Sequence, residues 1–153
     1  DAQQAQREMS LNLSEQQSPG DAGSILGASD GEQAAYDAAI DFFRQGQYKN
    51  AAESLSAFVQ QHPRSGYAPT AQFYLGSSLY ALKDYKTAIS RLQAMVQSFP
   101  DNARAPDALL VIAGSQIELN DRSGARATLQ RIVKEYAGSQ AANTARDRLQ
   151  LLQ

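Results

Sequence analysis

The sequence predicts an all-α protein, a right-handed solenoid of three helical hairpins followed by a C-terminal capping helix. Three observations support this prediction. Identical residues recur at a spacing of 37, each copy contains two segments with apolar side chains at helical spacing, and a proline or glycine follows each pair. A single helix pair cannot bury its apolar face alone, so the stacking of successive pairs is expected to supply the core.

The repeat defines the expected domain organisation. The three copies are expected at about 32–65, 66–102 and 103–138, and the capping helix at 140–152, within one domain that spans 32–153. Three copies with identical residues at a fixed offset are a strong signal of a repeat architecture. The identities include Ala51, Ala88 and Ala125; Leu55, Leu92 and Leu129; and Val59, Val96 and Val133.

Residues 1–31 are expected to form a flexible linker or tail. They are rich in Gln, Ser, Gly and Asp and contain no aromatic residue, so they offer little apolar surface to offset the entropy of ordering. The chain does not begin with methionine, and we expect a mature form or a piece of a longer protein. The alternative is the end of an upstream helix or coiled coil, because four apolar residues recur at helical spacing. They are Ala2, Ala5, Met9 and Leu13.

The first helix of each copy is apolar around much of its circumference, as expected for a helix that is packed on several sides. A serine or asparagine recurs ahead of these helices, at Ser65, Asn102 and Ser139, and is expected to act as their N-cap. In the middle copy the apolar residues are Phe73, Tyr74, Leu75, Leu79, Tyr80 and Leu82.

The second helix of each copy has a narrower apolar stripe. In the middle copy the apolar residues within 85–99 fall on one face, Asp84 is the expected N-cap, and Pro100 cannot continue the helix. The corresponding helices of the first and third copies are expected to end before Pro63 and Gly138. Short polar turns join the two helices of each pair.

The last helix has the pattern of a cap. Apolar residues between Ala141 and Leu152 lie on one stripe, and charged or amide side chains occupy the opposite face. A terminal element of a solenoid needs one apolar face toward the last repeat and one polar face toward water.

Small residues predict close packing within each hairpin. Alanine or glycine recurs at one position of the first helices, including Gly76, and alanine recurs at one position of the second helices, including Ala88. A missing side chain at both positions allows two helix axes to approach within the usual range of about 8 to 10 Å. A large residue at Gly76 or Ala88 is expected to cost about 1 to 3 kcal/mol.

Composition argues against catalysis. The chain has no cysteine, which excludes thiol nucleophiles and thiolate metal sites, and it has one histidine. His62 occupies the repeat position of Phe99 and Tyr136, so we expect a ring that packs at the end of a helix rather than a catalytic base. We expect no catalytic residues, no metal site and no cofactor.

Charge and hydropathy exclude two further classes. The net charge is −2, without the basic excess of nucleic-acid-binding proteins, so no nucleic-acid partner is expected. No stretch approaches the roughly 18 to 20 apolar residues that would span a bilayer, so no membrane insertion is expected.

The repeat resembles the tetratricopeptide repeat, whose usual period is about 34. The resemblance rests on Leu75-Gly76, Tyr85, Ala88, Leu92 and Pro100, and on a longer turn between copies that is bracketed by prolines. The third copy departs from this pattern, because Arg122 and Ala137 replace the tyrosine and the proline.

Within these repeats, residues 33–152 resemble the carboxyl-terminal domain of the YbgF/CpoB family of the Tol-Pal system. The resemblance rests on the entry segment 34–39, on the three repeats, and on the ending Ala145-Arg146-Asp147-Arg148-Leu149. It implies a periplasmic protein with a cleaved signal peptide, a trimerising upstream coiled coil and a flexible linker, while the repeats alone are expected to be monomeric. It also implies binding to TolA and to a bifunctional penicillin-binding protein.

The geometry of the repeat also implies a partner-binding groove on the concave side, lined by the first helix of each copy. Such a groove suits an extended or amphipathic segment of a partner. The alternative is that its aromatic rings, Tyr36, Phe73 and Tyr80 among them, merely pack between adjacent first helices. The expected groove residues are Tyr36, Ile40, Phe43, Arg44, Phe73, Ser77, Tyr80, Asp107, Leu110 and Ile117.

The expected function is an adaptor that coordinates outer-membrane constriction with peptidoglycan synthesis in cell division, as the resemblance implies, by binding TolA in the groove. One alternative is a scaffold in outer-membrane protein assembly, similar to BamD. Another is a ligand-binding accessory domain of a peptidoglycan enzyme.

Overall fold

A computed structural model describes residues 30–153, and within this range it contains seven α-helices and no β-strand. The predicted linker at 1–31 lies outside the described residues, except for its last two residues, which begin the first helix. The helices are α2 (Asp30–Arg44), α3 (Tyr48–Gln61), α4 (Ala68–Ala81), α5 (Tyr85–Ser98), α6 (Ala105–Glu118), α7 (Arg122–Glu135) and α8 (Gln140–Leu151).

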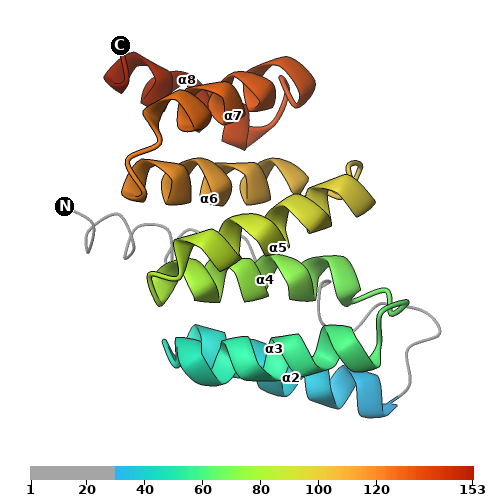
Figure 1. Ribbon diagram of the computed structural model, residues 1–153. Helices are drawn as coiled ribbons and strands as arrows, with labels where there is room; N and C mark the ends of the chain where they lie inside the picture. The colour runs from blue at the N-terminus through green and yellow to red at the C-terminus, as the bar shows by residue number, and fades with distance from the viewer. Residues whose placement is uncertain (1–29) are drawn as a thin grey trace.

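The helices stack in chain order as antiparallel pairs (Figure 1). α2 packs on α3, α4 on α5, and α6 on α7, while α8 covers the last pair. Each second helix also packs on the first helix of the next pair, so one apolar core runs through the stack. The fold is therefore an all-α helical repeat solenoid, as the period of 37 predicts.

Each hairpin turns through one residue in the left-handed backbone region. These residues are Gly46, Lys83 and Asn120, with φ angles of 77°, 67° and 63°. They are 37 residues apart, so the turn is repeated together with the helices. Glycine and asparagine adopt this conformation readily, whereas at Lys83 the Cβ atom crowds the backbone and the conformation is strained.

The helix starts differ in part from the sequence prediction. Ser139 is the N-cap of α8 and accepts a hydrogen bond from the amide of Ala142, as predicted. Ser65 and Asn102 instead accept from amides at 67 and 104, which precede α4 and α6, so they order the turn before each helix. Asp84 is the N-cap residue of α5, as predicted, but its side chain accepts no hydrogen bond from the first turn of the helix.

The close approach within the middle hairpin is confirmed. Gly76 of α4 faces Leu92 of α5, and a Cβ atom on Gly76 would lie 2.8 Å from Cδ1 of Leu92 and closer still to its Cγ. The glycine therefore makes room for a leucine side chain of the second helix. Ala88 is also fully buried, at the position predicted for a small residue.

The second helices end in the same way in all three copies. His62, Phe99 and Tyr136 are the C-caps of α3, α5 and α7, with φ angles of −131°, −133° and −129°. The His62 ring packs on Phe58 with ring centroids 5.2 Å apart, which is the packing role predicted for it. The Tyr136 hydroxyl donates to the carbonyl of Pro100 at 2.8 Å and so ties the third copy to the second.

Candidate functional site

The first helices form the inner side of the curved stack. α2 contacts α4, α4 contacts α6, and α6 contacts α8, whereas the second helices approach one another much less. A row of helices that lie closer together than the row behind it gives the stack a concave face. We call the side formed by α2, α4, α6 and α8 the inner side, and it is where the predicted groove residues lie.

Most of the predicted groove residues are buried. Their side chains belong to the continuous core or lie just beneath the inner surface. For the aromatic rings, this burial agrees with the alternative interpretation, in which the rings pack between neighbouring first helices. These residues are Tyr36, Ile40, Phe43, Phe73, Ser77 and Tyr80.

The other four predicted residues are accessible to different degrees. Asp107 and Leu110 are partly buried near the start of α6, and Leu110 packs on the core. Arg44 is exposed at the end of α2, and Ile117 is 38% exposed in the last turn of α6. Any contact with a partner on the inner side therefore involves these residues and their exposed neighbours.

A contact between neighbouring first helices repeats along the inner side. Tyr36 stacks on Tyr67, which lies just before α4, with ring centroids 4.5 Å apart. One repeat later the Arg104 guanidinium lies 5.4 Å from the centre of the Phe73 ring. A cation thus takes the place of a ring at the same repeat position. Sequence reasoning missed Tyr67 and Arg104, although their spacing of 37 was a usable signal.

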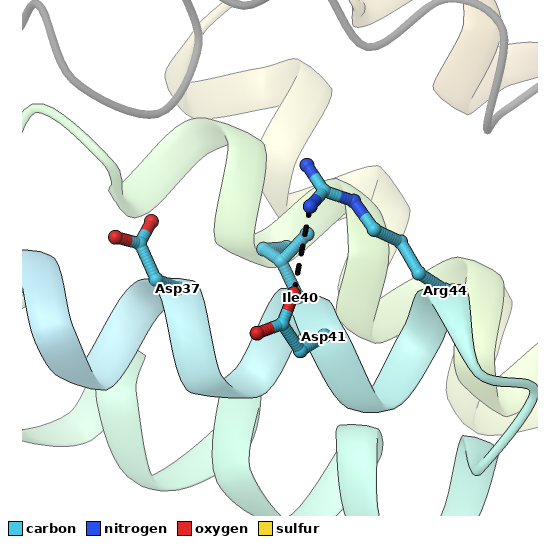
Figure 2. A pocket seen from close by; sticks show the side chains of 4 residues that line it. All are labelled: Asp37, Ile40, Asp41 and Arg44. Atoms are coloured by element: carbon cyan, nitrogen blue, oxygen red, sulfur yellow. Dashed lines mark hydrogen bonds and ion pairs between the residues drawn. The ribbon is translucent and has the colours of Figure 1, made fainter.

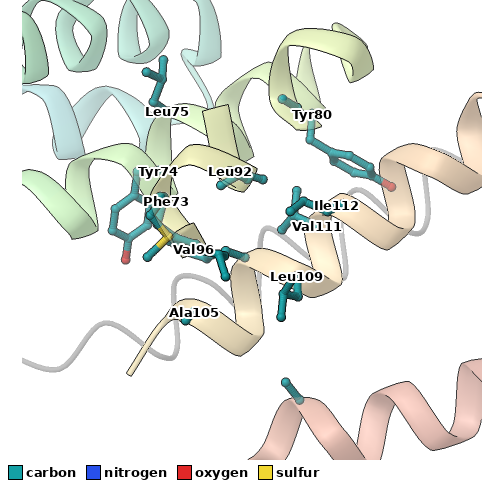
Figure 3. Close-up of a cluster of buried hydrophobic side chains, with 14 of the residues drawn as sticks. Phe73, Tyr74, Leu75, Tyr80, Leu92, Val96, Ala105, Leu109, Val111 and Ile112 are labelled. Carbon is teal, nitrogen blue, oxygen red and sulfur yellow. The ribbon is translucent and has the colours of Figure 1, made fainter. Parts of the chain in front are cut away.

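The Tyr80 ring bridges α4 and α6 in the core cluster (Figure 3). It packs over Gly114, where a Cβ atom would lie 3.4 Å from the ring, so the contact leaves little space. Burial raises the pKa of the Tyr80 hydroxyl to about 12, and the Glu118 carboxylate adds to the rise. Tyr80 is therefore a packing residue that lies next to the acidic end of α6.

A carboxyl group also lies half-buried at the start of α6. Burial raises the pKa of Asp107, while the nearby Arg104 guanidinium acts in the opposite direction. Arg104 is 93% buried and its guanidinium lies over the Phe73 ring, so two groups of opposite charge lie near each other here. This pair marks the middle of the inner side.

A hollow of about 280 Å³ opens on α2 at the first end of the stack. Asp37, Ile40, Asp41 and Arg44 line it, and Figure 2 shows their side chains along one side of the helix. Arg44 and Asp41 form an ion pair with Nη1 and Oδ1 3.5 Å apart. The accessible lining is therefore two carboxylates and one guanidinium, and Ile40 beneath them is almost fully buried.

Within 30–153, no cluster of three or more His, Cys, Asp or Glu side chains could hold a metal ion. The His62 imidazole lies 3.8 Å from the carboxylate of Glu32, and this contact ties the end of α3 to the start of α2. In the same range, no helix combines the length and the hydrophobicity needed to cross a bilayer.

Comparisons with known proteins agree with this architecture. The cell division coordinator CpoB of Pseudomonas putida strain KT2440 is 40% identical over 45 residues, which are 29% of this chain and 17% of that protein. A second cell division coordinator CpoB of Pseudomonas putida matches with the same identity and coverage. The matched segment is thus a small part of these relatives.

Two family models, both described as tetratricopeptide repeat, match residues 36–103 and 79–149. Together they span 36–149, from the middle of α2 to the end of the capping helix α8. Repeats of this kind mediate protein–protein interaction through their extended concave face. The chain therefore belongs to the tetratricopeptide repeat family.

Proposed function

We propose that this protein is a periplasmic adaptor of the Tol-Pal system that binds a helical segment of TolA along its inner side. In this role it coordinates outer-membrane constriction with peptidoglycan synthesis during cell division. A bifunctional penicillin-binding protein is a second proposed partner, and a homotrimer would form through an upstream coiled coil.

The observation that supports this proposal best is the similarity to the cell division coordinator CpoB within a tetratricopeptide repeat domain. The inner side supports a binding role for three reasons. It is continuous over the first helices, it has a hollow on α2, and it exposes Ile117 and Leu151 in the last turns of α6 and α8.

The buried aromatic residues are poor targets for a test, because their replacement would disturb the core. Ile117 is 38% exposed on the inner side, whereas Leu82 is 44% exposed at the hairpin turn after α4. Ile117→Ser and Leu82→Ser are therefore matched variants that each remove one exposed apolar side chain. Only the first change is on the proposed binding surface.

Titration of the chain with a TolA helical segment tests the proposal by calorimetry. We expect saturable binding that Ile117→Ser weakens about fivefold or more, since loss of a buried contact of about 1 kcal/mol changes affinity by that factor. Leu82→Ser is expected to bind like the unchanged chain. Absence of binding would rule out TolA as the partner. Equal loss of affinity in both variants would rule out the inner side as the binding surface.

A further inference from the structure

The charged residues of the hairpins are segregated by helix. From residue 32 onward, the first helices α2, α4 and α6 contain five carboxylates and one cation. The second helices α3, α5 and α7 contain seven cations and two carboxylates. The first set is Glu32, Asp37, Asp41, Asp107 and Glu118, with Arg44; the second is Lys49, Lys86, Arg91, Arg122, Arg126, Arg131 and Lys134, with Glu53 and Glu135.

This segregation gives the two sides of the solenoid opposite charges. The first helices form the inner side and the second helices form the opposite, outer side. The inner side of the three hairpins is therefore acidic and the outer side is basic, although the net charge of the whole chain is only −2. The capping helix α8, which completes the inner side, adds Arg146 and Arg148 with one carboxylate, Asp147, so the acidic character is concentrated on the hairpins. A charged surface attracts a partner of the opposite sign and repels one of the same sign.

The acidic inner side has a candidate binding site for a cationic side chain at its first end. In the hollow on α2, the Asp37 carboxylate makes no hydrogen bond or ion pair with any residue in 30–153. Asp41 is 59% exposed and pairs with Arg44 only at 3.5 Å. Ile40 lies beneath these carboxylates and is almost fully buried (Figure 2). The accessible carboxylates can pair with the charge of a lysine or arginine side chain.

The far end of the inner side also has an exposed acid beside apolar side chains, and Arg148 of α8 acts on the same Tyr80 hydroxyl as Glu118. Glu118 is exposed in the last turn of α6, next to the exposed Ile117. Leu151 of α8 is 80% exposed, and it follows Ile40 by three repeat lengths of 37 residues. The inner side thus exposes apolar side chains at its far end and carboxylates at its first end.

From this pattern we infer that the inner side binds a cationic amphipathic helix of a partner protein, with lysine or arginine side chains placed against Asp37, Asp41 and Glu118. The chain's own N-terminal segment does not have this chemistry, because residues 1–29 carry one cation and four carboxylates. The inference rests on the proposed function only in taking the inner side as the binding surface; it does not depend on TolA.

Two model peptides test the sign of the charge directly with the full 153-residue chain. One is an alanine-rich helix with lysines along one face and leucines beside them, and the other has glutamate in place of each lysine. We expect the lysine peptide to bind and the glutamate peptide not to bind. Raising NaCl from about 50 to about 200 mM should weaken the binding severalfold, because surface charges are screened.

Two variants locate the binding. Asp37→Asn with Asp41→Asn removes the charges of the hollow, and Glu53→Gln removes an exposed carboxylate from the outer helix α3. We expect the double variant to lose about fivefold or more in affinity for the lysine peptide, since each exposed pair contributes roughly 0.2 to 1 kcal/mol. Glu53→Gln should bind like the unchanged chain, and circular dichroism should show the same helix content in every variant.

The outcomes separate this inference from the proposed function. No binding of the lysine peptide, equal binding of both peptides, or unchanged affinity in the folded double variant would overturn the cationic partner. Binding of the TolA segment that is insensitive to salt and to the double variant would keep the proposed function and overturn the inference. Binding of the lysine peptide without binding of the TolA segment would keep the inference and overturn TolA as the proposed partner.

Discussion

The guanidinium carbon of Arg104 lies 5.4 Å from the centre of the Phe73 ring, at the repeat position where Tyr67 stacks on Tyr36. The same guanidinium lies 5.2 Å from the centre of the Tyr74 ring. A planar side chain is therefore present at both junctions between first helices, as a ring in one and a cation in the other. The next equivalent position is Ala141 in the capping helix, so the flat group is a feature of the two junctions between hairpins.

This relationship predicts unequal effects at position 104. Arg104→Ala should lower the free energy of unfolding by about 1 to 3 kcal/mol, because it removes cation–π contacts and leaves a cavity. Arg104→Tyr should cost less, since a tyrosine fills the same position in the preceding repeat. Urea denaturation of both variants checks this order, and a larger loss for Arg104→Tyr than for Arg104→Ala would contradict it.

Gly76 should tolerate a methyl group poorly, because it faces the Leu92 side chain across the middle hairpin. In Gly76→Ala the new Cβ atom would overlap the Leu92 side chain, and we expect a loss of about 1 to 3 kcal/mol from overpacking. Gly138→Ala is the matched control, because no atom lies within 4 Å of a Cβ atom there. Thermal denaturation should show a lower midpoint only for Gly76→Ala.

The left-handed turn at Lys83 offers a stabilising change. Lys83 has a φ angle of 67°, whereas glycine occupies the equivalent position 46. Lys83→Gly should raise the free energy of unfolding by about 0.5 to 1 kcal/mol, because glycine adopts this conformation without strain. The reference change is Lys86→Gly within α5, which should lower stability by about 1 kcal/mol. A loss of stability in Lys83→Gly would show that the turn needs the lysine side chain.

Alkaline pH should destabilise the fold through Tyr80. Burial raises the pKa of its hydroxyl from 10.0 to about 12, so the unfolded chain releases this proton at a lower pH than the folded chain. The stabilisation is complete below pH 10 and is lost as the pH rises toward 12, by about 1 to 2 kcal/mol. Urea unfolding measured at several pH values between 10 and 12 should show a smaller loss of unfolding free energy for Tyr80→Phe than for the unchanged chain. An equal loss in both proteins would contradict the assignment to Tyr80.

The fold was predictable because the repeat makes each local pattern appear several times. The stripes of the second helices, the turns, and the C-cap positions of His62 and Phe99 all follow from the period and from helical spacing. Gly76 was predicted as a point of close approach, but its neighbour Leu92 was not, because spacing within a helix does not identify the residue across from it.

The candidate site was less predictable for a physical reason. On each first helix, the side chains that face the inner surface and those that face the next repeat belong to one continuous apolar stripe. Periodicity therefore placed Tyr36 and Phe73 on the correct side of the helix without showing that both rings are covered. The covering residues, Tyr67 and Arg104, precede the next helix and fall outside any helical stripe.

Mapping of amide chemical shifts during titration with the TolA segment tests most directly whether a partner binds along the inner side. Residues of α2, α4, α6 and α8 should shift together, with the largest changes around Asp37, Asp41 and Ile117. The amides at the centre of α3, α5 and α7 should change little. Shifts confined to those second helices, or no shifts at saturating concentrations of the segment, would contradict binding along the inner side.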